Sequence, residues 1–355
     1  MSERAVNFHQ SPWQGVFYVT GGGASFLAEI LNTPGASATV LEVTVPYAYA
    51  ALTDLLGQEP EQATAALTAR QLAMAAFQRA YALGTGQLFG FGLTAALATN
   101  REKRGEHRAH WTIQTTTGTF SFNASYSSDR VQEEQQLLEH IWSCIQNTLL
   151  QMNVTCDSSV NSQHVNAAAD LAPLILGTAY KFSATNTPAQ LLLPGSFNPL
   201  HEGHKQMLAV AEAQTGLVGA LELTVKNADK PSLDFISLQE RVNNIGDYPL
   251  WLTNASTFSA KSKLFENTVF ALGVDTLARI GEVRFYRHRG DLLDQALATF
   301  VEQNTRFLVF GRREGDNFVT LKDLKIPHTL AQRCTGIDES TFRQDISSTE
   351  LRLGL

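Results

Sequence analysis

Alternation of strand-like and helix-like segments from residue 191 to residue 312 constrains the fold of this chain more than any other feature. Short apolar runs are each followed by a segment with helical periodicity. In chain order they are LLLPG (191–195), helix 204–214, GALELTV (219–225), helix 237–246, PLWLT (249–253), helix 258–267, TVFALGVD (268–275), helix 291–303 and RFLVFGR (306–312). Strands joined by helices pair in parallel, and helices cover both faces of the sheet. We therefore predict an α/β fold with a Rossmann-like parallel sheet in the C-terminal half.

The first 155 residues predict a second, mixed α/β unit. Strand-like runs occur at 16–19, 38–47 and 88–97, a hairpin at 107–126 turns at Thr117–Gly118, and helical periodicity covers 24–32, 61–83 and 131–152. Between about 156 and 189 the chain becomes polar, which is typical of a connection. We therefore predict domains at 1–155 and 190–355, joined by 156–189.

Composition excludes several classes of protein. A chain of 355 residues with 44% hydrophobic and 17% charged residues can form two globular cores. The net charge of −7 argues against a general nucleic-acid binder. The cysteines are Cys144, Cys156 and Cys334, which form no CxxC pair, so neither a disulfide framework nor a structural zinc site is indicated. Without a secretory pattern or a membrane-length apolar run, we expect a soluble cytoplasmic protein with no nucleic-acid or membrane partner. A homo-oligomer remains open.

The segment GSFNPLHEGH (195–204) lies where the first C-terminal strand gives way to its helix. In a parallel sheet, ligands bind beyond the carboxyl ends of the strands. Gly195 lets the backbone approach a ligand closely, and Gly203 removes a side chain beside the helix start, which favours anions. His201 and His204 can both donate hydrogen bonds to phosphate oxygens. The pattern therefore predicts a phosphate-binding loop.

Two other interpretations of the histidines compete with phosphate binding. HEGHK superficially resembles the zinc-protease motif, but that motif places its histidines four apart on a helix, whereas His201 and His204 are three apart at a strand–helix junction. No third ligand cluster is evident, so no metal held by protein side chains is predicted. Two surface histidines without function are the other alternative.

The C-terminal segment DISSTELR (345–352) is a second candidate phosphate-binding element. Ser347, Ser348 and Thr349 precede a short helical pattern, and Arg352 follows one turn later. Hydroxyls and amides at a helix start, together with a guanidinium, suit phosphate oxygens. The alternative is an ordinary Ser/Thr cap of a C-terminal helix.

These motifs together resemble a known superfamily. GSFNPLHEGH matches the GxFxPxHxGH signature of the nucleotidylyltransferases, and ISSTELR matches their second signature, ISSTxxR. Asn198, FALGVDTL (270–277) and FLVFGRREG (307–315) look most like the nicotinamide mononucleotide adenylyltransferases. The resemblance implies transfer of AMP from ATP to nicotinamide or nicotinate mononucleotide, with release of pyrophosphate, in NAD biosynthesis.

The resemblance also implies a role for each matching residue. His201 and His204 would bind the ATP phosphates, with His204 nearest the reacting phosphorus. Residues Ser347, Ser348, Thr349 and Arg352 would hold the leaving phosphates. The nucleotide cleft would be lined by Gly195, Ser196, Phe197 and Gly203, the adenosine side would be contacted by Gly273 and Asp275, and Arg312 would be the strand-end arginine. Mg²⁺ is expected to enter with ATP, held mainly by substrate and water.

The N-terminal half resembles another family. YVTGGG (18–23), TPGAS (33–37) and the following strand that ends in Tyr47 resemble the CinA-type nicotinamide mononucleotide deamidases over roughly residues 10–155. That family has a nucleophilic serine where this chain has Tyr18, and a lysine where it has Leu52. Its glycine-rich TGIAGP element is replaced by LTAALATNREKRG (93–105).

Serine and lysine are the groups that attack and activate in such a site, so we predict that this domain does not deamidate by the family's mechanism. Thr20, Gly21 and Gly22 could still bind a phosphate at a helix start. A domain that only supports the fold or oligomerisation is the alternative.

Three functions therefore remain open at this level. The first is adenylyl transfer to a pyridine mononucleotide, and the second is nucleotidyl transfer to another phosphorylated acceptor. The third is a non-catalytic pyridine-nucleotide sensor. The sequence does not distinguish the amidated from the acid mononucleotide.

Overall fold

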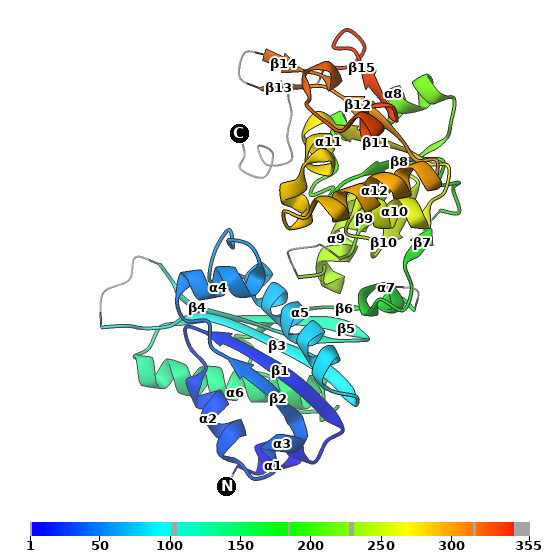
Figure 1. The fold of residues 1–355 in the computed structure, drawn as a ribbon. Helices are drawn as coiled ribbons and strands as arrows, with labels where there is room; N and C mark the ends of the chain where they lie inside the picture. The colour runs from blue at the N-terminus through cyan, green and yellow to red at the C-terminus, as the bar shows by residue number, and fades with distance from the viewer. Residues whose placement is uncertain are drawn as a thin grey trace. The chain divides into compact units, whose positions relative to one another are not determined.

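The computed structural model describes residues 2–100, 105–169, 171–183, 185–226, 231–314 and 317–343. The chain divides into two compact units. The first holds the chain up to Ala172 together with the described residues of Asp229–Leu238, and the second holds the remainder from Pro173 onward. Each unit is built on its own mixed β-sheet, which confirms the predicted α/β class (Figure 1).

The N-terminal unit contains a six-stranded sheet of order β2-β1-β3-β4-β5-β6. Its strands are β1 (Trp13–Thr20), β2 (Val40–Thr44), β3 (Gln87–Ala96), β4 (His107–Thr115), β5 (Gly118–Tyr126) and β6 (Asn161–Asn166). Its helices are α1 (Glu3–His9), α2 (Ala24–Asn32), α3 (Ala36–Thr39), α4 (Tyr49–Leu56), α5 (Ala66–Leu83) and α6 (Arg130–Thr148). Strand β1 pairs in parallel with β2 and β3, and β3 to β6 form an antiparallel meander.

Alternation along β3 explains how helices cover both faces of this sheet. Phe89 and Phe91 are fully buried in the core that α2 and α6 also form. Between them, a methyl group on Gly90 would lie 2.1 Å from the carbonyl oxygen of Ala73 on α5. The glycines of β3 therefore allow the backbone of α5 to pack directly on one face of the sheet (Figure 1). The aromatic rings fill the other face.

Residues 231–238 pack in the N-terminal unit although the sequence analysis placed them in the C-terminal domain. The buried Arg70 guanidinium lies 3.3 Å from the Asp234 carboxylate. The amide of Phe235 donates to the Thr119 hydroxyl at 2.9 Å. A buried ion pair leaves no periodic pattern in the sequence. The predicted domain boundaries therefore did not include residues 231–238 in the N-terminal unit.

The C-terminal unit contains a seven-stranded sheet of order β15-β12-β11-β8-β9-β10-β7. Its strands are β7 (Lys181–Ser183), β8 (Leu191–Pro194), β9 (Gly219–Thr224), β10 (Leu250–Thr253), β11 (Val269–Gly273), β12 (Arg306–Phe310) and β15 (Cys334–Ile337). The helices that follow Leu171 are α7 (Ala172–Leu176), α8 (Glu202–Thr215), α9 (Phe235–Ile245), α10 (Phe258–Leu264), α11 (Val274–Gly281), α12 (Gly290–Glu302) and α13 (His328–Ala331). A short hairpin, β13 (Arg312–Glu314) and β14 (Asn317–Val319), follows β12.

All pairings in this sheet are parallel except that of β7 with β10. Numbered from β8 along the chain, the parallel strands have the order 3-2-1-4-5-6 of a Rossmann-like sheet. The order reverses between β8 and β11. Ligands bind at such a reversal, beyond the carboxyl ends of the strands. Gly195 and Gly273 stand at the two strand ends that flank it.

The predicted connection 156–189 is more structured than its composition indicated, because β6 joins the first sheet and β7 joins the second. Helix α11 and strand β15 were not predicted at all. Among the residues described, no helix is long and apolar enough to cross a membrane.

Candidate functional site

The loop after β8 is held by its own residues. The amide of Gly195 donates to the carbonyl oxygen of Glu222 on β9 at 3.0 Å. A methyl group on Gly195 would lie 2.6 Å from Cε1 of Phe197, so the Phe197 ring fills the space that a side chain would need. Ser196 is exposed, and Gly203 is buried in the first turn of α8. Packing within the loop therefore favours glycine at position 195, whether or not a ligand also approaches the backbone there.

The sequence predicts that Phe197 lines the nucleotide cleft, and in the structure its side chain is buried. Phe197 has a positive φ of 43° and no exposed surface. Its ring meets the His204 ring edge-on, with centroids 5.2 Å apart. A bulky residue in the left-handed region costs about 1–3 kcal/mol, so surrounding contacts must hold it there. The ring is buried, and it packs against both Gly195 of the loop and the His204 ring.

His201 and His204 lie together at the start of α8. Their rings stack with centroids 3.8 Å apart and an interplanar angle of 27°. The backbone amide of His201 donates to Nδ1 of His204 at 3.4 Å. Because Nδ1 accepts, the neutral His204 ring carries its proton on Nε2. Nδ1 of His201 is a buried nitrogen with no hydrogen-bond partner in the described part of the chain.

Both histidines are neutral at ordinary pH. Burial, and then the neighbouring His201, lower the pKa of His204 to about 4. Burial also lowers the pKa of His201. The pair therefore offers N–H donors rather than positive charges. Such donors, with the positive end of the α8 dipole, suit phosphate oxygens.

The end of β11 forms the other side of the strand reversal. Gly273 precedes α11, and a methyl group there would lie more than 4 Å from every atom of the residues that the structure describes. Neither backbone strain nor packing against those residues requires glycine at this position. Asp275, in the first turn of α11, forms an ion pair with Arg312 on β13. The structure thus brings together Asp275 and Arg312, two of the predicted nucleotide-binding residues, as partners of each other.

Arg241 on α9 is a residue that the sequence analysis missed. Its Nη1 donates to the carbonyl oxygen of Ser196 at 3.0 Å. It is therefore a cation in contact with the loop between Gly195 and His201. Nothing in SLQERVNNI distinguishes this arginine from one on a solvated helix face, so the sequence alone offered no signal.

The second signature element lies outside the described residues. Ser347, Ser348, Thr349 and Arg352 all fall beyond residue 343, and their predicted roles stay predictions. Within the described ranges, no group of three or more histidine, cysteine, aspartate or glutamate residues is arranged to hold a metal ion.

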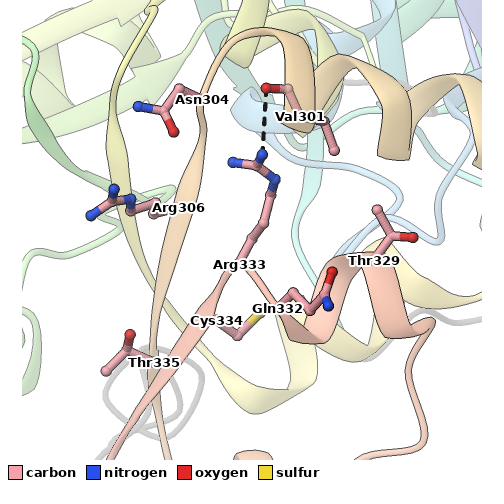
Figure 2. A pocket seen from close by; sticks show the side chains of 8 residues that line it. All are labelled: Val301, Asn304, Arg306, Thr329, Gln332, Arg333, Cys334 and Thr335. Carbon is pink, nitrogen blue, oxygen red and sulfur yellow. Dashed lines mark hydrogen bonds between the residues drawn. The ribbon is translucent and has the colours of Figure 1, made fainter.

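A cavity of about 520 Å³, whose lining residues Figure 2 shows, opens at the opposite end of the strands from the candidate site. It lies beside Arg306 and Cys334, the first residues of β12 and β15, and therefore at the amino ends of the strands. Arg333 donates to the carbonyl oxygens of Thr305 and Val301, at 3.2 and 3.5 Å, beyond and within the last turn of α12. That contact is typical of a helix end. The cavity is thus separate from the candidate site.

In the N-terminal unit, the positions that differ from the deamidase pattern are buried. Tyr18 is 4% exposed and Leu52 is 3% exposed. The Tyr18 hydroxyl donates to Glu42 at 3.3 Å, and burial, followed by Glu42, raises its pKa to about 12. Thr20 donates to the carbonyl oxygen of Pro46 at 3.0 Å. Tyr18 is therefore not available as an ionised nucleophile at neutral pH.

The start of α2 is the helix end that the sequence suggested as a phosphate site. A carboxylate of the same chain already binds there. The amides of Gly23 and Ser25 donate to the two carboxylate oxygens of Glu134, at 3.1 and 3.0 Å. Gly21 has a positive φ of 87°, and a methyl group there would clash with the carbonyl oxygen of Ala95. A phosphate at this helix start would have to displace Glu134.

Comparison with known proteins matches a family model and solved structures. Residues 192–354 match the family described as Cytidylyltransferase-like, which supports nucleotidyl transfer as the general chemistry of the C-terminal unit. The crystal structure of competence/damage inducible protein CihA from Agrobacterium tumefaciens matches with a TM-score of 0.34 and 17% identity, over 40% of this chain and 88% of that chain. Because both the TM-score and the identity are low, we infer nothing about function from this similarity. No curated protein matches the chain.

Proposed function

We propose that the C-terminal unit transfers AMP from ATP to nicotinamide or nicotinate mononucleotide and releases pyrophosphate. The observation that carries this proposal is the stacked, neutral pair His201 and His204 at the start of α8. The pair stands beside the strand reversal of a Rossmann-like sheet, in the region that matches the cytidylyltransferase-like family.

The proposed reaction needs little from the protein beyond positioning. An oxygen of the acceptor phosphate attacks the α-phosphorus of ATP, and the bond from that phosphorus to the bridging oxygen breaks as pyrophosphate leaves. The attacking oxygen is already ionised, so no general base is required. Catalysis then depends on alignment and on donors aimed at the charge that develops. A neutral His204 with its proton on Nε2 is such a donor.

The remaining residues take their proposed roles from position. No atom of the described residues lies within 4 Å of a methyl group built on Gly273, which leaves room for a nucleotide to approach the backbone there. Asp275 can accept hydrogen bonds from ribose hydroxyls while Arg312 shares its carboxylate. Ser347, Ser348, Thr349 and Arg352 would hold the phosphates that leave.

Mg²⁺ is proposed to enter with ATP. The donors around the loop are imidazole N–H groups and backbone amides, which bind phosphate oxygens rather than Mg²⁺. Phosphate oxygens and water would therefore coordinate the ion. Its chemistry is to neutralise the charge of the leaving phosphates.

We also propose that the N-terminal unit does not deamidate pyridine mononucleotides by a serine–lysine mechanism. The buried Tyr18 and Leu52 support this, because neither can attack or activate.

Pyrophosphate release from Mg²⁺-ATP tests both proposals when nicotinamide mononucleotide, nicotinate mononucleotide and no acceptor are compared, with ammonia followed in parallel. Release that depends on either mononucleotide, without ammonia, supports the transferase. Silence with both mononucleotides refutes this choice of acceptor and favours another phosphorylated acceptor or a sensor. Ammonia production would refute the proposal for the N-terminal unit.

A further inference from the structure

A buried ion pair includes Glu222, the strand residue whose carbonyl oxygen accepts a hydrogen bond from the loop that carries the two histidines. Glu222 on β9 has no exposed surface, and Lys261 on α10 is 7% exposed. Lys261 Nζ is 2.5 Å from Oε2 of Glu222. The hydroxyls of Thr224 and Thr253 both donate to Oε1 of the same carboxylate. One charged cluster therefore joins β9, β10 and α10.

A buried ion pair is by itself weak evidence of a stabilising role. Both charges lose their water on folding, and well-packed apolar residues of similar volume often replace buried ion pairs without loss of stability. Removing only one partner is strongly destabilising, because it leaves the other charge buried and uncompensated. The pair is therefore better explained if it fixes the position of the backbone that carries Glu222.

That geometry reaches the candidate site through consecutive contacts. The carbonyl oxygen of Glu222 accepts from the amide of Gly195, at 3.0 Å, in register with the end of β8. Gly195 is in close contact with the Phe197 ring. Phe197 in turn packs edge-on against His204. Displacing the Glu222 backbone would therefore move Gly195, then Phe197, and then the imidazole nearest the proposed reaction.

We infer that Glu222 and Lys261 are positioning residues of the nucleotidyl-transfer site, which fix the Gly195 loop through the Glu222 backbone. This inference rests on the proposed function for its catalytic consequence. Neither side chain is exposed enough to contact substrate, so both act through the loop.

The test compares Glu222→Gln, Lys261→Met and the double variant with wild type in the full-length chain. The two single variants should melt at lower temperature, and the double variant should recover most of that loss. If the pair positions the loop, the double variant still exchanges the Gly195 amide about tenfold faster than wild type. Its kcat for pyrophosphate release falls by about tenfold or more, while the KM for ATP changes much less.

Two further measurements keep the inference falsifiable. Thr253→Val removes one hydroxyl that donates to Glu222 and keeps the side-chain shape, so it serves if the double variant does not fold. It should change the same readouts in the same direction, by less. The matched control neutralises the exposed pair Arg289 and Asp291 by Arg289→Gln with Asp291→Asn, and should leave Gly195 exchange and kcat unchanged.

The outcomes separate this inference from the proposed function. A double variant, or Thr253→Val in its place, with wild-type Gly195 exchange and wild-type kcat shows that the pair only contributes stability, and overturns the inference. If wild type releases no pyrophosphate with any acceptor, the proposed function fails, and Gly195 exchange still decides whether the pair positions the loop.

Discussion

The imidazole rings of His201 and His204 stack with centroids 3.8 Å apart, and the His201 amide donates to Nδ1 of His204. The backbone of one histidine thus sets the tautomer of the other. With Nδ1 engaged, Nε2 of His204 is left as a donor. A pair with this arrangement can bind phosphate oxygens in one fixed orientation without carrying charge.

Replacement of His204 by alanine should therefore remove a donor that acts on the reacting phosphate. The expected loss in kcat is about 100- to 1,000-fold, the usual effect of deleting one such donor. The fold should persist, because the ring lies at the helix start rather than in the hydrophobic core. Pyrophosphate release and the melting temperature, measured together, check both statements. The control is His328→Ala, an exposed histidine at the start of α13, which should keep full activity. Full activity in His204→Ala would remove the proposed role.

The low pKa of His204 predicts how stability changes with pH. The unfolded chain takes up this proton below the ordinary value of 6.5, whereas the folded chain resists until about pH 4. The stability that His204 contributes is therefore complete above pH 6.5 and is lost as the pH falls from 6.5 to about 4, by about 3 kcal/mol in all. Melting of wild type and His204→Gln from pH 7.5 to pH 4.5 measures it.

Other histidines contribute in the same pH range, because burial also lowers the pKa of His110, His140 and His201. Only the difference between the two melting curves belongs to His204. The curve of His204→Gln should be flatter. Parallel curves would show that His204 is not held neutral by the fold.

The elements of both units were largely predictable because their hydrophobic periodicity is local. Helix α2 has the predicted bounds, 24–32, and the strands that end at Pro194 and Gly273 lie where apolar runs predicted them. Strand β7 was not predicted, because three residues with a half-polar pattern carry no periodic signal. It is placed by pairing with β10, which is a long-range contact.

Within the candidate site, the sequence identified the loop but not its supports. His201, His204 and Gly195 were visible because their residue types and spacing suit phosphate chemistry. Arg241 and Glu222 contact the same loop from other elements, through a carbonyl oxygen in one case and an amide in the other. Any residue type can supply those backbone groups, so contacts of this kind leave no pattern in the sequence.

Arg241 should support activity through its contact with the Ser196 carbonyl oxygen. Arg241→Gln removes a charged hydrogen bond, which is typically worth about 1.5–3 kcal/mol, so kcat/KM should fall by about tenfold or more. The control on the same helix is Asn243→Ala, at an exposed residue whose side-chain oxygen accepts a hydrogen bond from Gln239. Steady-state kinetics with both substrates varied decide the outcome. Equal kcat/KM in the two variants would assign Arg241 to the helix surface.

Glu134 should stabilise the N-terminal unit by occupying the start of α2. Glu134→Ala leaves the amides of Gly23 and Ser25 without their carboxylate, and we expect a loss of about 1–2 kcal/mol in the free energy of unfolding. The same variant should bind inorganic phosphate more tightly than wild type, because the helix start is then open to an anion. Denaturant unfolding and calorimetric titration measure the two effects, with Gln135→Ala, an exposed neighbour on α6, as the control. Unchanged unfolding in Glu134→Ala would mean that water replaces the carboxylate without cost, and unchanged phosphate affinity would mean that this helix start is not an anion site.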